Sequence, residues 1–157
     1  MDVLVRQADA ACAQAHGLRQ GVAPSRHPGA APGNKYLDWA RTVQGYVEGA
    51  EGFHLVRGLG GHGIGKELHQ APYISNVVPD YPGEWPESKL ICEPGVLVAV
   101  EPMIAVGTGK VKQNGNQWPV YSADGSMSVH YEHDVLITEG GPRVLTAGLD
   151  ELNDVIE

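Results

Sequence analysis

Short β-rich segments separated by glycine and proline fill most of the chain after residue 53, and they restrict its fold more than any other feature. The chain has 21 glycines and 11 prolines among 157 residues, which is too many for a helical bundle and normal for frequent turns. Branched and aromatic side chains within these segments predict strands. The predicted strands cover residues 53–57, 96–102, 117–121, 126–132, 134–138 and 143–146.

Two helices are expected before the strands. Apolar residues recur at spacings of three and four over residues 2–17 and again over 36–50. Residues 18–35 predict an irregular loop, and the proline-rich residues 77–95 predict a surface loop. Helices followed by strands predict an α+β fold, in which a mostly antiparallel sheet carries the helices on one face. We expect residues 1–157 to form a single domain that ends in an acidic tail over 147–157.

The charge and composition exclude several classes of protein. The chain has 11 basic and 19 acidic residues, a formal charge of −8, which argues against nucleic acid and anionic membranes as partners. No apolar run approaches the ~20 residues that span a bilayer. The N-terminal residues do not resemble a signal peptide, and Cys12 and Cys92 form no CxxC motif, so we expect a cytoplasmic protein.

Three residues are candidate metal ligands. His62 lies within the glycine-rich sequence GGHGIG, where glycines permit close backbone approach and unusual φ angles, while Glu101 and Glu132 end or flank predicted strands. A buried carboxylate must be paired, protonated or bound to a cation. One imidazole and two carboxylates suit Mn²⁺, Fe²⁺, Co²⁺ or Zn²⁺. The alternative is a hydrogen-bonded turn histidine with carboxylates held by arginine or backbone N–H groups, and ligand chemistry alone leaves both possibilities open.

Several spaced motifs together resemble the C-terminal half of the type I methionine aminopeptidases, members of the pita-bread metallopeptidase family. They include HLVRGLGGHGIG, ELHQAPYISN, EPGVLVAVEPM and SMSVHYEHDVLIT, and the likeness runs from about residue 36 to residue 146. The resemblance implies a partial pita-bread fold with a curved sheet. It also implies metal-dependent removal of N-terminal methionine from peptides and nascent proteins.

The resemblance assigns roles to the candidate ligands. His62 and Glu101 would ligate one ion of a two-metal centre, Glu132 would bridge both ions, and Glu101 would also act as general base. The family uses two divalent ions, such as Co²⁺, Mn²⁺, Fe²⁺ or Zn²⁺. We find no counterpart here of the two aspartates that the family's first half supplies, so we expect this chain alone to bind one ion weakly.

Three further residues take substrate roles by the same resemblance. His69 matches a histidine that hydrogen-bonds the substrate, with a surface imidazole as the alternative. Leu68 and Trp118 match positions that line the methionine side-chain pocket, with membership of the core as the alternative. The partners implied are peptides or nascent chains with N-terminal methionine.

Two rival functions remain open at this point. One is a non-catalytic pita-bread module that binds protein or RNA, although the negative charge disfavours RNA. The other is a fragment that pairs with a separate N-terminal half. Without that half, we expect the chain to expose an apolar sheet edge and to self-associate.

Overall fold

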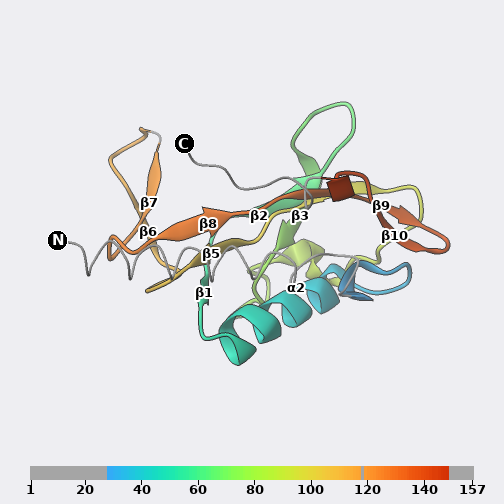
Figure 1. The fold of residues 1–157 in the computed structure, drawn as a ribbon. Coiled ribbons are helices and arrows are strands. Elements are labelled where there is room, and N and C mark those ends of the chain that lie inside the picture. Colours follow the sequence, from blue (N-terminus) through green and yellow to red (C-terminus); the bar gives the residue numbers. More distant parts are fainter. Residues whose placement is uncertain (1–27, 118, 149–157) are drawn as a thin grey trace.

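The structure, a computed structural model, describes residues 28–117 and 119–148. The helix predicted over 2–17, residues 18–27 of the predicted loop, Trp118 and residues 149–157 of the predicted tail lie outside this part. Within it, antiparallel strands form an extended layer, and one α-helix crosses beneath that layer (Figure 1). The α+β class and the mostly antiparallel sheet are therefore confirmed.

The helix predicted over residues 36–50 is confirmed. A short 3-10 helix, η1 (Pro28–Ala30), precedes α2 (Tyr36–Gln44), which continues as the π-helix η2 (Gly45–Ala50). The backbone N–H of Lys35 donates to the carboxylate of Asp38 at 3.0 Å, and this bond satisfies a donor at the helix N-terminus. The residues that α2 and η2 turn toward the sheet are Tyr36, Trp39, Ala40, Val43 and Val47, all buried.

The strands form three antiparallel sheets. The largest has the order β10-β9-β4-β2-β3, the second the order β1-β5-β8, and β6 pairs with β7 in a hairpin. The bounds are β1 His54–Leu55, β2 Gly60–Gly63, β3 Gln70–Ser75, β4 Leu97–Val100, β5 Met103–Ala105, β6 Val111–Gln113, β7 Val120–Ser122, β8 Ser128–His130, β9 His133–Thr138 and β10 Gly141–Val144.

Each predicted strand overlaps an observed one, but the sequence analysis did not predict β2, β3, β5 or β6. Pro72 lies inside β3 and disfavours a strand by pattern, yet β3 is the edge of its sheet, where proline is tolerated. All three residues of β6 are exposed, so the strand has no alternation of polar and apolar residues to detect. For β3 and β6, therefore, pairing with a neighbouring strand creates the strand, and local sequence preference does not.

The core lies between the helix and the sheet. Alternate residues of β9 are buried, namely His133, Val135 and Ile137, which is the period-two pattern of a strand with one covered face. Trp39 and Val43 of α2 belong to the same buried cluster. Burying one such aliphatic side chain stabilises the fold by about 1.5–3 kcal/mol. One face of the sheet is therefore covered by the helix, and the side chains on the other face are available for a functional site.

The segment 77–95 is only partly the surface loop that its prolines predict. It contains a 3-10 helix, η3 (Pro86–Lys89), and two of its side chains, Trp85 and Cys92, are buried in the core. The indole N–H of Trp85 donates to the carbonyl of Tyr73 at 3.0 Å. Burial raises the pKa of Cys92 to about 11, so its thiol stays protonated and packs as an apolar group. The segment 77–95 is thus anchored to the core at Trp85 and Cys92.

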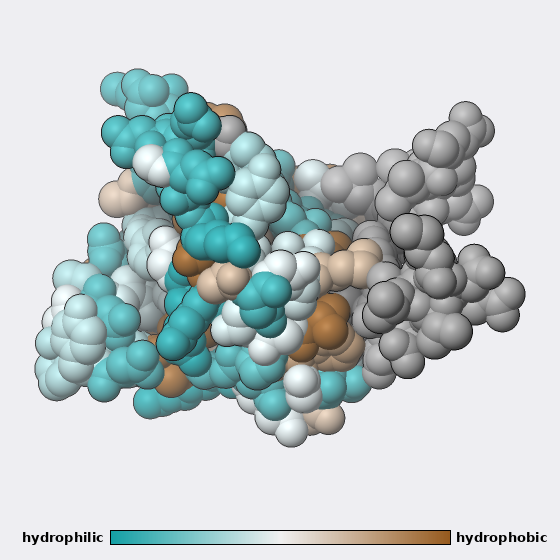
Figure 2. Space-filling model, turned by 90° about the vertical axis from the view of Figure 1, so that its left-hand side faces the viewer, coloured by the Kyte–Doolittle hydropathy of each residue, from teal (hydrophilic) through white to brown (hydrophobic). Residues whose placement is uncertain are grey.

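At the end that bears β6 and β7, the described residues mix hydrophobic with hydrophilic side chains on the surface. Figure 2 views that end and shows hydrophobic side chains in separate patches among hydrophilic ones. Within residues 28–117 and 119–148, no helix is long and apolar enough to cross a membrane. The self-association expected from the sequence stays a prediction.

Glycines beside His62 let three strands approach closely. A Cβ on Gly61 would overlap the carbonyl oxygen of Ala99 on β4, and a Cβ on Gly63 would overlap the carbonyl oxygen of Ala71 on β3. Neither glycine has a positive φ, so the expectation of unusual φ angles here is wrong. Their function is to remove side-chain bulk between neighbouring backbones.

We expect Gly61→Ala to lower the free energy of unfolding by about 1–3 kcal/mol, because the added methyl group meets backbone atoms that cannot rotate away. Urea denaturation followed by circular dichroism measures the change. Gly49→Ala is the matched control, since nothing lies within 4 Å of a Cβ at this exposed helical position. Equal stability of the two variants would contradict the close-approach explanation.

Candidate metal centre

The register of the sheet brings the three predicted ligands together, one from β2 and two from the residues that directly follow β4 and precede β9. His62 on β2 pairs with Ala99 on β4, and Val100 on β4 pairs with His133 on β9. The next positions along that register are Glu101 and Glu132, which therefore face each other across two antiparallel segments. Glu101 lies two residues after Ala99, so its side chain projects to the same face as that of His62.

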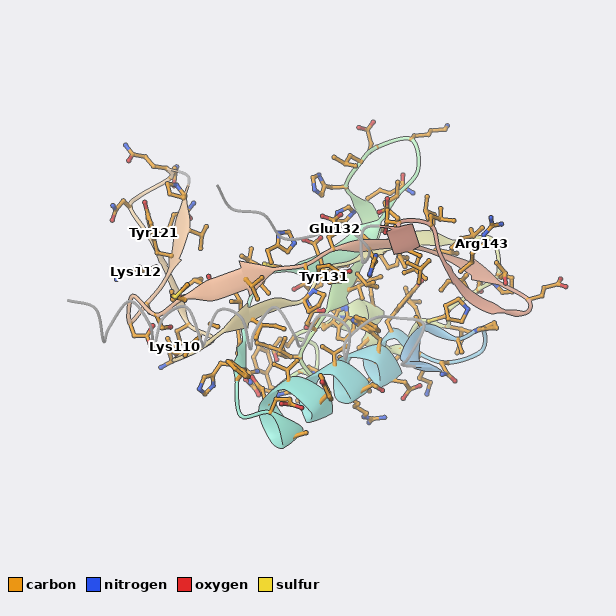
Figure 3. The ribbon with its side chains drawn as sticks, viewed as in Figure 1. Lys110, Lys112, Tyr121, Tyr131, Glu132 and Arg143 are labelled. Carbon is orange, nitrogen blue, oxygen red and sulfur yellow. The ribbon has the colours of Figure 1, made fainter. Side chains whose placement is uncertain are left out.

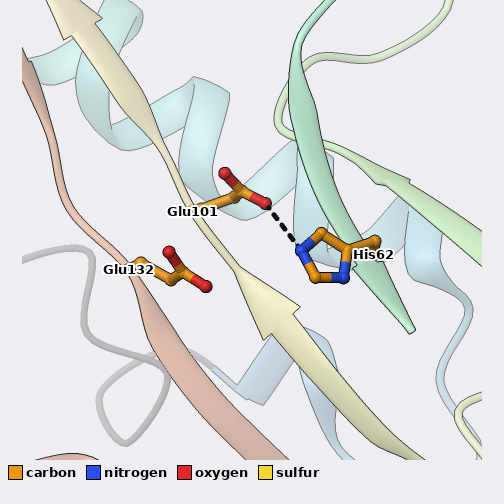
Figure 4. A group of neighbouring side chains, drawn as sticks. All are labelled: His62, Glu101 and Glu132. Carbon is orange, nitrogen blue, oxygen red and sulfur yellow. Dashed lines mark ion pairs between the residues drawn. The ribbon is translucent and has the colours of Figure 1, made fainter. Parts of the chain in front are cut away.

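The side-chain atoms confirm this meeting. One ligand atom from each of His62, Glu101 and Glu132 lies within 4.8 Å of the others (Figure 4). His62 Nε2 is 3.4 Å from Glu101 Oε1. The His62 and Glu101 side chains are each only 13% exposed, whereas Glu132 is exposed at the open side. The cluster is thus closed on one side and accessible on the other.

The negative charges of Glu101 and Glu132 favour a cation at this cluster. Two carboxylates opposite each other repel, and the described ion-pair partners of Glu101 are the histidines His62 and His130 rather than an arginine or a lysine. Figure 3 shows Lys110, Lys112 and Arg143 near the two ends of the molecule, away from Glu132. The alternative in which an arginine holds Glu101 is therefore wrong for the described residues.

The tautomer of His62 supports the same conclusion. His62 Nδ1 is 3.0 Å from the carbonyl oxygen of Gly63, and since a carbonyl only accepts, Nδ1 must carry the hydrogen. In the protonated ring Nε2 donates to Glu101 Oε1, and in the neutral ring the lone pair of Nε2 is free to bind a cation on that side. A backbone carbonyl on the far ring nitrogen is the usual support of a metal-binding histidine.

Glu132 is held in place by its neighbours. The hydroxyl of Tyr131 and Nε2 of His133 are 2.8 Å apart, and His133 Nδ1 is 2.8 Å from the hydroxyl of Thr146. Figure 3 shows Tyr131 and Glu132 on opposite sides of the segment that joins β8 to β9. These contacts tie the flanking residues to the protein interior, so that Glu132 is directed to the opposite, open face.

Two residues of the site escaped the sequence analysis. Asn76, only 1% exposed, donates from Nδ2 to the backbone carbonyl of Glu101 at 3.1 Å and accepts from the indole N–H of Trp39 at 3.4 Å. His130 Nε2 lies 3.1 Å from Glu101 Oε2. The signal for His130 was its position two residues before Glu132, which places both on one face of an extended chain.

The hydrogen bond to Glu101 raises the pKa of His130, because it favours the charged imidazolium, while partial desolvation opposes this effect. The negative charges of Glu101 and Glu132 act in the same direction as the hydrogen bond. This shift is a second sign that the cluster concentrates negative potential.

Of the predicted substrate residues, only His69 is shown to lie beside the cluster. The ring of His69 lies 4.3 Å from that of His62, centroid to centroid, so His69 is beside the cluster and exposed to solvent. Leu68 is 68% exposed on the loop between β2 and β3. Trp118 lies outside the described residues. The pocket role of Leu68 and Trp118 stays a prediction.

A cavity of about 230 Å³ opens next to the cluster. Apolar side chains form most of its wall, and His130 forms part of it, so the cavity and the carboxylate cluster share one residue. The lining residues are Val56, Leu59, Met103, Val111, Val120, Tyr121, Ser122, Ser128, Val129 and His130. The site therefore combines a cation-attracting cluster with a neighbouring space suited to an apolar group.

An antiparallel sheet that presents an imidazole and two carboxylates on one open face offers a donor set of the kind that holds a divalent metal ion. The model of metallopeptidase family M24 matches residues 25–139, so the chain belongs to that family. This match confirms the resemblance to the metallopeptidase family that the sequence motifs indicated.

Individual relatives agree with this placement. The chain is 44% identical over 114 residues to the methionine aminopeptidase of Clostridium acetobutylicum, covering 73% of this chain and 43% of that protein. It superposes on the crystal structure of the methionine aminopeptidase from Thermotoga maritima with a TM-score of 0.72 and 32% identity, covering 85% of this chain and 51% of that one. The Xaa-Pro dipeptidase from Bacillus anthracis gives a TM-score of 0.51 and 25% identity, covering 77% of this chain and 26% of that one.

The chain spans less than half the length of the curated relatives it matches, 43% in the case of the Clostridium acetobutylicum protein. The likeness therefore concerns one part of those proteins. The pita-bread fold predicted from the sequence is confirmed for that part by the Thermotoga maritima structure.

We expect the pKa of His130 in the metal-free protein to lie above the ordinary histidine value of about 6.5 and to fall in Glu101→Gln. Because the folded pKa is the higher one, this contact stabilises the fold fully below about pH 6.5 and the contribution is lost as pH rises through the folded pKa. Titration followed by NMR of the imidazole signals measures both values. Glu139→Gln removes the same charge in the turn between β9 and β10, and an equal fall there would contradict the contact.

Proposed function

We propose that this chain is the metal-binding part of an aminopeptidase that removes N-terminal methionine from peptides and nascent proteins. The observation that carries the proposal is the convergence of His62, Glu101 and Glu132 within 4.8 Å, on the fold of a methionine aminopeptidase. The names of the relatives support the substrate class.

The donor set fits a divalent cation. His62 supplies the nitrogen whose lone pair faces Glu101, and the two glutamates supply charge that a divalent ion neutralises. We propose Mn²⁺, Co²⁺, Fe²⁺ or Zn²⁺ as the ion. When bound, such an ion polarises a peptide carbonyl and lowers the pKa of a water molecule.

Side chains of the site carry out proton transfer and substrate binding. Glu101 would accept the proton of the attacking water and return it to the leaving amine. His69, exposed beside His62, donates a hydrogen bond to the substrate amide. The neighbouring apolar cavity receives the methionine side chain. The part that Leu68 and Trp118 take in this pocket rests on the resemblance alone.

A complete centre needs ligands beyond these three. We propose that a separate or preceding first half supplies further carboxylates, because the chain spans less than half of its relatives and Glu132 faces an open side. The purely non-catalytic module predicts no ion affinity at this cluster. Ion binding therefore separates the two functions.

We expect isothermal titration calorimetry to show one Mn²⁺ bound, and His62→Ala and Glu132→Gln each to weaken the affinity by about 10-fold or more, since each removes a ligand. His54→Ala is the control, because His54 is exposed on β1 and outside the cluster. Unchanged binding in both cluster variants would place the ion elsewhere.

We expect the chain alone to release methionine from a Met-Gly-Met peptide in Mn²⁺ at least ~10²-fold more slowly than the chain mixed with the polypeptide that corresponds to the rest of the Clostridium acetobutylicum relative. Groups that act as one unit fail together when some are absent. Glu101→Gln should abolish the activity of the mixture. Rapid release by the chain alone would show that three ligands suffice.

A further inference from the structure

His130 contacts the cluster but stands apart from the three ligands. It ends β8, its side chain is half exposed, and its Nε2 is 3.1 Å from Glu101 Oε2. It is not part of the group of ligand atoms that lie within 4.8 Å of one another. His130 therefore reaches Glu101 from outside the space that an ion would occupy.

The two oxygens of Glu101 face different histidines. Oε1 is 3.4 Å from His62 Nε2, inside the cluster, and Oε2 is 3.1 Å from His130 Nε2, on the other side. An imidazole N–H that donates to Oε2 fixes the plane of the carboxylate and leaves Oε1 to face the cluster. Hydrogen bonds of this kind orient ligating carboxylates in metal sites.

The backbone of Glu101 is already held independently. Buried Asn76 donates to its carbonyl, and the indole N–H of Trp39 holds Asn76 in turn. The main freedom left to Glu101 is rotation of its side chain, and His130 restricts that rotation. A carboxylate that stays in one rotamer loses less entropy when it binds an ion.

We propose that His130 is the positioning residue of the metal centre, one that holds Glu101 Oε2 so that Oε1 binds the ion. This inference rests on the proposed function, because it needs an ion at the cluster of His62, Glu101 and Glu132. It assigns His130 no direct bond to the ion.

The test measures Mn²⁺ affinity in variants of the full chain by calorimetry. His130→Leu, which removes the donor, is expected to weaken binding about 10–100-fold, whereas His130→Gln, whose amide can still donate to Oε2, stays within about 3-fold of the parent. His54→Leu is the matched control for losing an exposed histidine. In the Glu101→Gln background, His130→Leu should cause no further loss, because the carboxylate that His130 orients toward the ion is gone.

A second readout tells an orienting residue from a ligand. Pulsed EPR of bound Mn²⁺ should detect a single coupled imidazole nitrogen, that of His62, in both the parent and His130→Leu. Two coupled nitrogens in the parent and one in His130→Leu would make His130 a ligand and overturn the inference. Near-ultraviolet circular dichroism confirms that each variant is folded.

The outcomes also separate this inference from the function on which it rests. If His62→Ala abolishes Mn²⁺ binding while His130→Leu binds as tightly as the parent, the metal centre stands and the positioning role is wrong. If the parent itself binds no Mn²⁺, or His62→Ala binds as well as the parent, the proposed centre fails and the inference fails with it.

Discussion

The antiparallel pairing of β4 with β9 places Glu101 opposite Glu132, and this unfavourable juxtaposition governs the rest of the site. Two carboxylates at such close range repel unless positive charge lies between or beside them. The chain surrounds Glu101 with two histidines and with no described lysine or arginine. Two neighbouring carboxylates without a cation destabilise the fold, whereas a bound cation is attracted by both. The burial of Glu101 and the charge of the cluster therefore both favour a cation site.

The scaffold around His62 and Glu101 is closely packed and hydrogen-bonded. Gly61 and Gly63 let β2 approach its neighbours, so His62 is brought within reach of Glu101. Asn76 connects the backbone of Glu101 to Trp39 of α2, and the core between helix and sheet therefore supports the site directly. Glu132, by contrast, is exposed on the open side. The cluster is thus supported by the core on one side and open to solvent at Glu132.

Sequence patterns predicted much of the fold because most elements are locally amphipathic. The helix over 36–50 and the strand at 134–138 show regular burial, and the structure confirms both. β3 was missed because Pro72 opposes the pattern, and only its place at a sheet edge allows it. Trp85 and Cys92 were assigned to a surface loop, since nothing in a proline-rich sequence shows that single side chains return to the core.

The sequence by itself determined which chemical groups are present: the helical and strand segments, the glycines that flank His62, and the three candidate ligands recognised by their motifs. The tertiary structure alone decided which atoms meet. Residues 39 and 31 positions apart along the chain meet because backbone pairing sets the strand register, and local sequence carries no measure of that register. For the same reason the contacts of Asn76 and His130 with Glu101 appeared only in the folded chain, where hydrogen bonds between distant residues depend on positions that packing defines.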